Sequence, residues 1–132
     1  MSEQSIKKVL ITGANGFIGN SLMRFYQQNN QAVVGVDLVG NGTDIIEADI
    51  AKPESIANVL DDCDVIIHTA ALVSNAMEDS NMWRVNVQAT GNLINAAKIH
   101  KVRRFVQISS IVAYGNAAEG ELDENHPVHA DG

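Results

Sequence analysis

Five short runs of apolar, mostly β-branched residues alternate along this chain with segments of helical character. The runs are nearly continuous rather than alternately apolar and polar, which is typical of strands buried on both faces of a parallel sheet. We therefore expect a parallel sheet of about five strands, formed by Val9-Leu10-Ile11, Ala32-Val33-Val34-Gly35-Val36, Ile45-Ile46, Val65-Ile66-Ile67 and Phe105-Val106-Gln107-Ile108.

Helices are expected between these strands, at 17–29, 53–61 and 79–100. Pro53 suits the first turn of the middle helix. The pattern of the longest segment begins after Asp79-Ser80, residues that can cap a helix, and it carries a continuous apolar face. The order of strand, helix and strand predicts one doubly wound α/β domain of the Rossmann type, with helices on both faces of the sheet.

Composition excludes several kinds of partner. The 132 residues carry a net charge of −7 and no run of Lys or Arg longer than two, so neither nucleic acid nor a membrane surface is expected to bind. The single cysteine, Cys63, has no companion for a disulfide or a metal site, and we expect it to be buried, with no metal bound. No apolar run approaches a signal segment or a membrane helix, which favours a cytoplasmic protein.

A glycine-rich segment links the first strand to the first helix. Amides at a helix N-terminus bind pyrophosphate when the backbone can approach it closely. Gly13 would make the sharp turn, Gly16 would remove a side chain facing the phosphates, and Gly19 would let the helix pack near the strand. Three glycines also mark ordinary turns, and this spacing is one residue wider than the common fingerprint. The whole segment is the candidate phosphate site: Gly13, Ala14, Asn15, Gly16, Phe17, Ile18 and Gly19.

An acidic residue at the end of the second strand strengthens this interpretation. Asp37 follows the last glycine at about the spacing of 20 residues where a carboxylate accepts hydrogen bonds from the adenosine ribose hydroxyls. A solvated turn aspartate is the competing interpretation. Residues 38–42 contain no Lys or Arg to receive a 2′-phosphate, and Asp37 would repel one. The sequence therefore favours NAD over NADP as the cofactor.

With these features the sequence resembles the extended short-chain dehydrogenase/reductase family. That family includes nucleotide-sugar epimerases and dehydratases, hydroxysteroid dehydrogenases and dihydroflavonol-type reductases. The resemblance covers nearly the whole chain and rests on five landmarks in order: Thr12-Gly13-Ala14-Asn15-Gly16-Phe17-Ile18-Gly19, Asp37, Ala48-Asp49-Ile50, His68-Thr69-Ala70-Ala71, and Ser109-Ser110 followed by Ala113-Tyr114-Gly115.

The resemblance implies further cofactor contacts. Asp49 and Ile50 would contact adenine, although a capping role before Pro53 is an alternative for Asp49. The segment after the fourth strand would contact the ribose and phosphates through Thr69, Ala70 and Ala71.

It also implies roles near the reacting groups. Ser110 matches the family's catalytic serine, which hydrogen-bonds the reacting oxygen, and Ser109 beside it would contact the cofactor if anything. Asn86 matches an asparagine that bridges backbone near the site, or else it faces water. His68 closes an apolar strand and is expected to be structural rather than catalytic.

The family's general acid/base pair, Tyr-x-x-x-Lys, is missing from this sequence. Tyr114 and Tyr26 are followed four residues later by Ala118 and Asn30, and no lysine follows Lys101. We expect residues 1–114 to form the NAD-binding domain and residues 115–132 to form a loop that leads to the catalytic region of a longer protein. This chain alone should then show little turnover.

The expected parent protein is an NAD-dependent oxidoreductase that acts on a secondary alcohol or ketone. Residues 68–74 look closer to hydroxysteroid dehydrogenases and dihydroflavonol reductases, and a nucleotide-sugar epimerase or dehydratase is the alternative. A non-catalytic NAD-sensing module is a third possibility, since such folds host both roles. The expected partners are a small-molecule substrate and a second copy of the chain, paired through the 79–100 helix.

Overall fold

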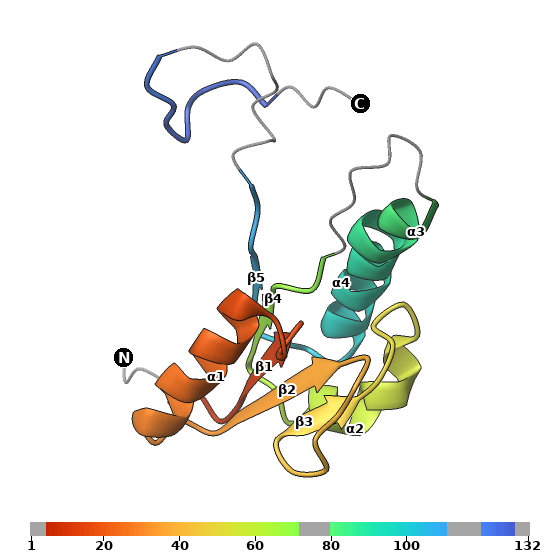
Figure 1. The fold of residues 1–132 in the computed structure, drawn as a ribbon. Coiled ribbons are helices and arrows are strands. Elements are labelled where there is room, and N and C mark those ends of the chain that lie inside the picture. The colour runs from red at the N-terminus through yellow and green to blue at the C-terminus, as the bar shows by residue number, and fades with distance from the viewer. Residues whose placement is uncertain (1–4, 72–79, 111–119, 129–132) are drawn as a thin grey trace.

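In the computed structural model, which describes residues 5–71, 80–110 and 120–128, one sheet of five parallel strands organises the chain (Figure 1). The strand order is β3-β2-β1-β4-β5. This confirms the expected parallel sheet, and the boundaries differ from the sequence expectation by only one or two residues. The strands are β1 (Val9–Thr12), β2 (Val33–Asp37), β3 (Ile45–Glu47), β4 (Val65–His68) and β5 (Arg104–Gln107).

The strand order reverses direction between β1 and β4. The chain builds outward from β1 through β2 to β3, then returns to the other side of β1 to add β4 and β5. Thr12 at the end of β1 pairs with Val36 of β2 on one side and with His68 of β4 on the other. The carboxyl ends of the three central strands therefore lie level. In open parallel sheets, ligands bind at such a reversal point.

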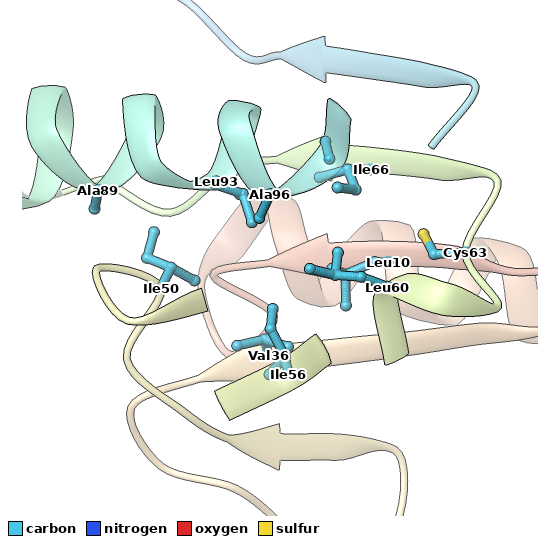
Figure 2. Close-up of a cluster of buried hydrophobic side chains, with 11 residues drawn as sticks. Leu10, Val36, Ile50, Ile56, Leu60, Cys63, Ile66, Ala89, Leu93 and Ala96 are labelled. Carbon is cyan, nitrogen blue, oxygen red and sulfur yellow. The ribbon is translucent and has the colours of Figure 1, made fainter. Parts of the chain in front are cut away.

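Helices cover both faces of the sheet (Figure 1). On one face, Val9 and Ile11 pack with Ala14 and Met23 beneath α1. On the other face, Leu10 of β1 packs under α2 and α4, where Leu60 and Leu93 are fully buried (Figure 2). The alternation along β1 explains why its run is apolar at every position. The helical segments are α1 (Phe17–Gln28), η1 (Pro53–Ile56), α2 (Ala57–Asp61), α3 (Ser80–Trp83), η2 (Arg84–Gln88) and α4 (Ala89–Ile99).

The long segment expected at 79–100 is not one regular α-helix. Residue 79 lies outside the described residues, and from Ser80 to Ile99 the segment passes through α3, the π-helical turn η2 and α4. In η2 the N–H of Ala89 reaches back five residues to the carbonyl of Arg84. Single π-helical turns within α-helices are frequently found at functional sites. No periodicity in the sequence predicted this turn.

Three further features of the described residues concern membrane helices, metal ligands and the single cysteine. No helix in 5–71, 80–110 or 120–128 has the length and hydropathy to cross a bilayer. Those same residues contain no cluster of metal-ligating side chains. Cys63 is buried and free, and burial raises the pKa of its thiol.

Candidate cofactor-binding site

A cleft of about 480 Å³ lies at the carboxyl ends of β1, β2 and β4, where the strand order reverses. Its size falls within the range of about 300–1,000 Å³ typical of small-molecule sites. One wall comes from the glycine segment, and the opposite wall comes from η2 and the start of α4. The lining residues are Gly13, Gly16, Phe17, Ile18, Gly19, Val36, Asp37, Leu38, Ala48, Asp49, Ile50, Thr69, Ala70, Ala71, Arg84, Val85 and Ala89.

The glycine segment turns the chain from β1 into α1 and forms one wall of this cleft. Gly13 adopts a φ of +68°, a left-handed conformation that favours glycine, and its N–H donates to Val36 O at 2.9 Å. A Cβ on Gly13 would lie 2.8 Å from the backbone nitrogen of Ala70. The turn that the sequence predicted is therefore present, and it allows β4 to approach the loop.

The N-terminus of α1 opens into the cleft without a capping side chain. Gly16 is the N-cap, and no side-chain hydrogen bond closes the first turn. Phe17, Ile18 and Gly19, whose backbone amides form this turn, all line the cleft. Helix N-termini leave donors unsatisfied and carry a partial positive charge, so this end of α1 suits an anionic group.

Two members of the predicted phosphate segment do not line the cleft. The side chain of Ala14 is fully buried in the core with Met23. Asn15 instead joins the loop to β2, because its Nδ2 donates to Val39 O at 2.8 Å and its N–H donates to Asp37 Oδ2 at 2.9 Å. Both residues shape the loop, and neither presents a side chain to the cleft.

Asp37 lies on the rim of the cleft at the end of β2. One carboxylate oxygen accepts the Asn15 N–H, and the other accepts the N–H of Leu38 at 2.8 Å. The carboxylate is therefore held beside the glycine segment. Each oxygen keeps capacity for a further hydrogen bond, because an ionised carboxylate has about four acceptor positions.

The β3 end of the cleft holds the predicted adenine residues. Ile50 and Asp49 both line it. Asp49 accepts the Ala51 N–H at 3.0 Å and pairs with Arg84 Nη1 at 3.3 Å. The pKa of Asp49 lies below its ordinary value, first because of the Ala51 N–H and then because of Arg84, against an opposing effect of burial. Asp49 thus shapes the turn before Pro53 and also faces the cleft. It does not cap the following helical turn, whose N-cap is Lys52 without a side-chain hydrogen bond, and its contact with adenine stays a prediction.

The β4 end of the cleft rests on buried polar contacts. Thr69 and Ala70 line the cleft, and Thr69 Oγ1 donates to the carbonyl of Thr12 at 2.6 Å. His68 is fully buried beneath them, with hydrogen bonds at both ring nitrogens, to Thr12 Oγ1 at 2.6 Å and to Thr90 Oγ1 at 2.8 Å. Burial lowers its pKa from 6.5 to about 4. The expectation that His68 is structural agrees with this position.

The predicted catalytic end is separate from the cleft. Ser109 and Ser110 follow β5, two strands from the glycine segment, and both are exposed and do not line the cleft. Asn86 lies in η2 and is half-buried; its carbonyl accepts the Thr90 hydroxyl at 2.9 Å. Tyr114, one of the family landmarks, lies outside the described residues.

Sequence reasoning missed six lining residues. Val36, Leu38 and Ala48 flank residues that it did name. The other three residues are Arg84, Val85 and Ala89 of the long helical segment. No local sequence signal marks them, because they face the cleft only through the packing of this segment against the sheet.

Together, the sheet reversal, the uncapped helix N-terminus and the carboxylate after β2 define a Rossmann-type dinucleotide-binding domain. A model of the NAD dependent epimerase/dehydratase family matches residues 9–131, and the chain belongs to that family. The resemblance and the fold class inferred from the sequence are thereby confirmed. The predicted cofactor, NAD, agrees with the family's description.

The chain is also similar to individual proteins and solved structures. The low-salt glycan biosynthesis protein Agl12 of Haloferax volcanii is 30% identical over an alignment of 138 residues. The alignment covers 91% of this chain and 44% of that protein. A short-chain dehydrogenase/reductase superfamily protein from Agrobacterium tumefaciens with bound NAD superposes with a TM-score of 0.84 at 28% identity, covering 95% of this chain and 40% of that one.

The UDP-glucose-4-epimerase of Stenotrophomonas maltophila, solved with NAD and formylated UDP-arabinopyranose, superposes with a TM-score of 0.83 at 26% identity, covering 95% of this chain and 43% of that one. The chain thus spans less than half the length of these similar proteins.

Proposed function

We propose that this chain is the cofactor-binding part of an NAD-dependent enzyme that acts on a secondary alcohol or ketone. The observation that carries the proposal is the joint placement of two groups on one cleft. The uncapped N-terminus of α1 supplies donors for a pyrophosphate, and the Asp37 carboxylate supplies acceptors for a ribose. The two features correspond to the two charged and polar parts of an adenosine diphosphate.

The residues present fit the dinucleotide. Gly16 lines the cleft without a side chain, so a phosphate can approach the first turn of α1. Phe17 and Leu38 are 91% and 65% exposed beside it, and a bound ring system would cover this apolar surface. Asp49 and Arg84 supply an acceptor and a donor at the β3 end for a base edge. When bound, NAD would supply the acceptor of a hydride from the substrate carbon.

We propose further that this chain alone does not turn over substrate. Ser110 would position the substrate oxygen, but the sequence contains no Tyr-x-x-x-Lys to transfer the proton. In this proposal residues 115–132 connect the cofactor domain, 1–114, to the region that supplies the pair. The nicotinamide end would therefore be weakly held here, and ADP-ribose should bind about as well as NAD.

Two substrate classes are supported by the comparisons. Related proteins include a 3-beta-hydroxysteroid dehydrogenase of Mycolicibacterium neoaurum and a dTDP-glucose 4,6-dehydratase of Streptomyces niveus. Residues 68–74 favour a hydroxysteroid dehydrogenase or dihydroflavonol reductase-like substrate, although residues 72–74 lie outside the described part of the chain. A nucleotide sugar is the second candidate, because solved neighbours such as the Stenotrophomonas epimerase hold one.

Calorimetric titration of the purified chain with NAD and ADP-ribose tests the cofactor proposal. The test variant is Gly16→Ala, with Gly91→Ala as its control, because both add one methyl group and the methyl at Gly91 meets nothing within 4 Å. Gly16→Ala should weaken both ligands by about tenfold, the equivalent of one charge-assisted hydrogen bond, and Gly91→Ala should weaken neither. Absence of binding would refute the proposal. NAD binding far tighter than ADP-ribose would refute the incomplete nicotinamide site.

Assays of the full-length protein that contains this chain distinguish the substrates. Formation of NADH with a 3-hydroxysteroid or a flavan-4-ol supports the first class. Conversion of a UDP- or dTDP-sugar without net NADH supports the second.

A further inference from the structure

A series of buried and partly buried hydrogen bonds runs beneath the cleft and joins the segment after β4 to the wall formed by η2 and α4. It starts at the N–H groups of Thr69 and Ala70, which both lie 3.1 Å from Thr12 Oγ1. From Thr12 Oγ1 it continues to His68 Nδ1 at 2.6 Å, and from His68 Nε2 to Thr90 Oγ1 at 2.8 Å. It ends where the Thr90 hydroxyl meets the carbonyl of Asn86, at 2.9 Å. Thr12 and His68 are fully buried.

The groups at the two ends of this series fix which atom donates in every one of its hydrogen bonds. A hydroxyl oxygen has two lone pairs and one proton. The two amides occupy both lone pairs of Thr12 Oγ1, so its proton must point to His68 Nδ1, which is then unprotonated. At the other end, the carbonyl of Asn86 can only accept, so the Thr90 hydroxyl donates to it and must itself accept from His68 Nε2–H. Both ends independently require the same neutral tautomer.

This series of hydrogen bonds ends at the π-helical turn in the wall formed by η2 and α4. Asn86 lies in the π-helical turn η2, whose residues Arg84 and Val85 line the cleft. Thr90 is the second residue of α4, directly after that turn. The hydrogen bond between His68 Nε2 and Thr90 Oγ1 therefore ties the join between η2 and α4 to the end of β4, and the bond from Thr90 to Asn86 extends this link into η2.

We infer that His68, as the Nε2–H tautomer, is a positioning residue that holds the Thr69–Ala71 wall and the η2 wall of the cofactor cleft at a fixed separation, with Thr90 as its partner on the helix. The inference rests on the proposed function, because it assigns this series of hydrogen bonds to cofactor binding. His68 does not line the cleft, and both its nitrogens are occupied, so it touches no ligand and acts only through its neighbours.

The tautomer can be tested without any ligand. Long-range proton–nitrogen correlation NMR at neutral pH separates protonated from unprotonated imidazole nitrogens. The spectrum of His68→Gln identifies the signals of His68 among the four histidines of the chain. We expect an unprotonated Nδ1 and a slowly exchanging Nε2–H. An Nδ1–H tautomer or an imidazolium would overturn the inference.

The positioning role is tested by NAD titration of Thr90→Val and Thr90→Ser, with circular dichroism to show that each variant is folded. Valine keeps the shape of threonine and removes the hydroxyl, whereas serine keeps the hydroxyl. Thr90→Val should weaken NAD binding about 3–10-fold, as expected for the loss of one or two partly buried hydrogen bonds, and Thr90→Ser should keep most of the affinity.

Two outcomes would overturn the inference alone: NAD binding by Thr90→Val at the affinity of the unaltered chain, or equal losses in the valine and serine variants, which would mean that packing and not the hydroxyl matters. Failure of the unaltered chain to bind NAD would overturn the proposed function together with the inference.

Discussion

Two helical glycines should respond in opposite ways to the same substitution. Gly19 is the third residue of α1, and Gly91 is the third residue of α4. A Cβ on Gly91 would meet nothing within 4 Å, whereas a Cβ on Gly19 would lie 2.1 Å from Gly13 O and 2.8 Å from Gly13 C. The neighbours of Gly19 are backbone atoms of the glycine segment, and they cannot rotate away as a side chain would.

The sizes of the two effects follow from this geometry. Replacing a helical glycine by alanine removes about 1 kcal/mol of helix-propensity penalty, so Gly91→Ala should stabilise the chain by about that amount. In Gly19→Ala the helix and the loop must separate by about 1 Å to bring this contact back to 3.0 Å. Overpacking of this kind costs about 1–3 kcal/mol, and rigid neighbours place Gly19 at the upper end. After the propensity gain, a net loss of about 2 kcal/mol is expected.

Thermal unfolding followed by circular dichroism measures both variants. At about 3–5 °C per kcal/mol, Gly91→Ala should raise Tm by about 3–5 °C, and Gly19→Ala should lower it by about 6–10 °C. Because the displaced helix end carries the candidate phosphate donors, Gly19→Ala should also weaken NAD binding by about tenfold or more. A Gly19→Ala chain as stable as the unaltered one would refute the claim that close packing of helix against loop requires glycine there.

Three further predictions address specificity, pH and assembly. Asp37→Ala should weaken NAD binding about 10–100-fold and narrow its preference over NADP in calorimetric titration, whereas Asp62→Ala, which removes an equal charge from an exposed site, should do neither. His68 is protonated near pH 6.5 in the unfolded chain and only near pH 4 in the folded chain. Its contribution to the free energy of unfolding should therefore be fully present above about pH 6.5 and should fall by about 3 kcal/mol as the pH drops to about 4. Urea unfolding across that window should show a smaller fall in His68→Gln, and an unchanged slope would contradict the assignment. Trp83 and Val87 are 61% and 45% exposed on the long helix, so sedimentation should show a dimer that Val87→Glu dissociates; a concentration-independent monomer would contradict pairing through this helix.

Much of the fold was readable from the sequence because the determinants are local. Continuous apolar runs predict strands buried on both faces, and their alternation with helices requires a parallel sheet. The turn at Gly13 and the close approach at Gly19 follow from a short segment whose glycines permit a backbone that other residues resist. Asp37 was predictable for the same reason, since its place at a strand end is set by its own neighbours.

Only the tertiary structure decided what packs across elements. Ala14 belongs to the segment predicted to bind phosphates, yet its side chain faces the core, because the direction of each side chain in a turn depends on the path between strand and helix. Arg84 meets Asp49 across 35 residues of sequence, and no spacing signals that pairing. The links of His68 to Thr12 and Thr90 likewise require the register of β1 and β4 and the rotation of the long helix about its axis. Strands and turns are determined by residues that are neighbours in the sequence. The separation and polarity of the cleft walls depend instead on contacts that exist only once the sheet and its helices have packed.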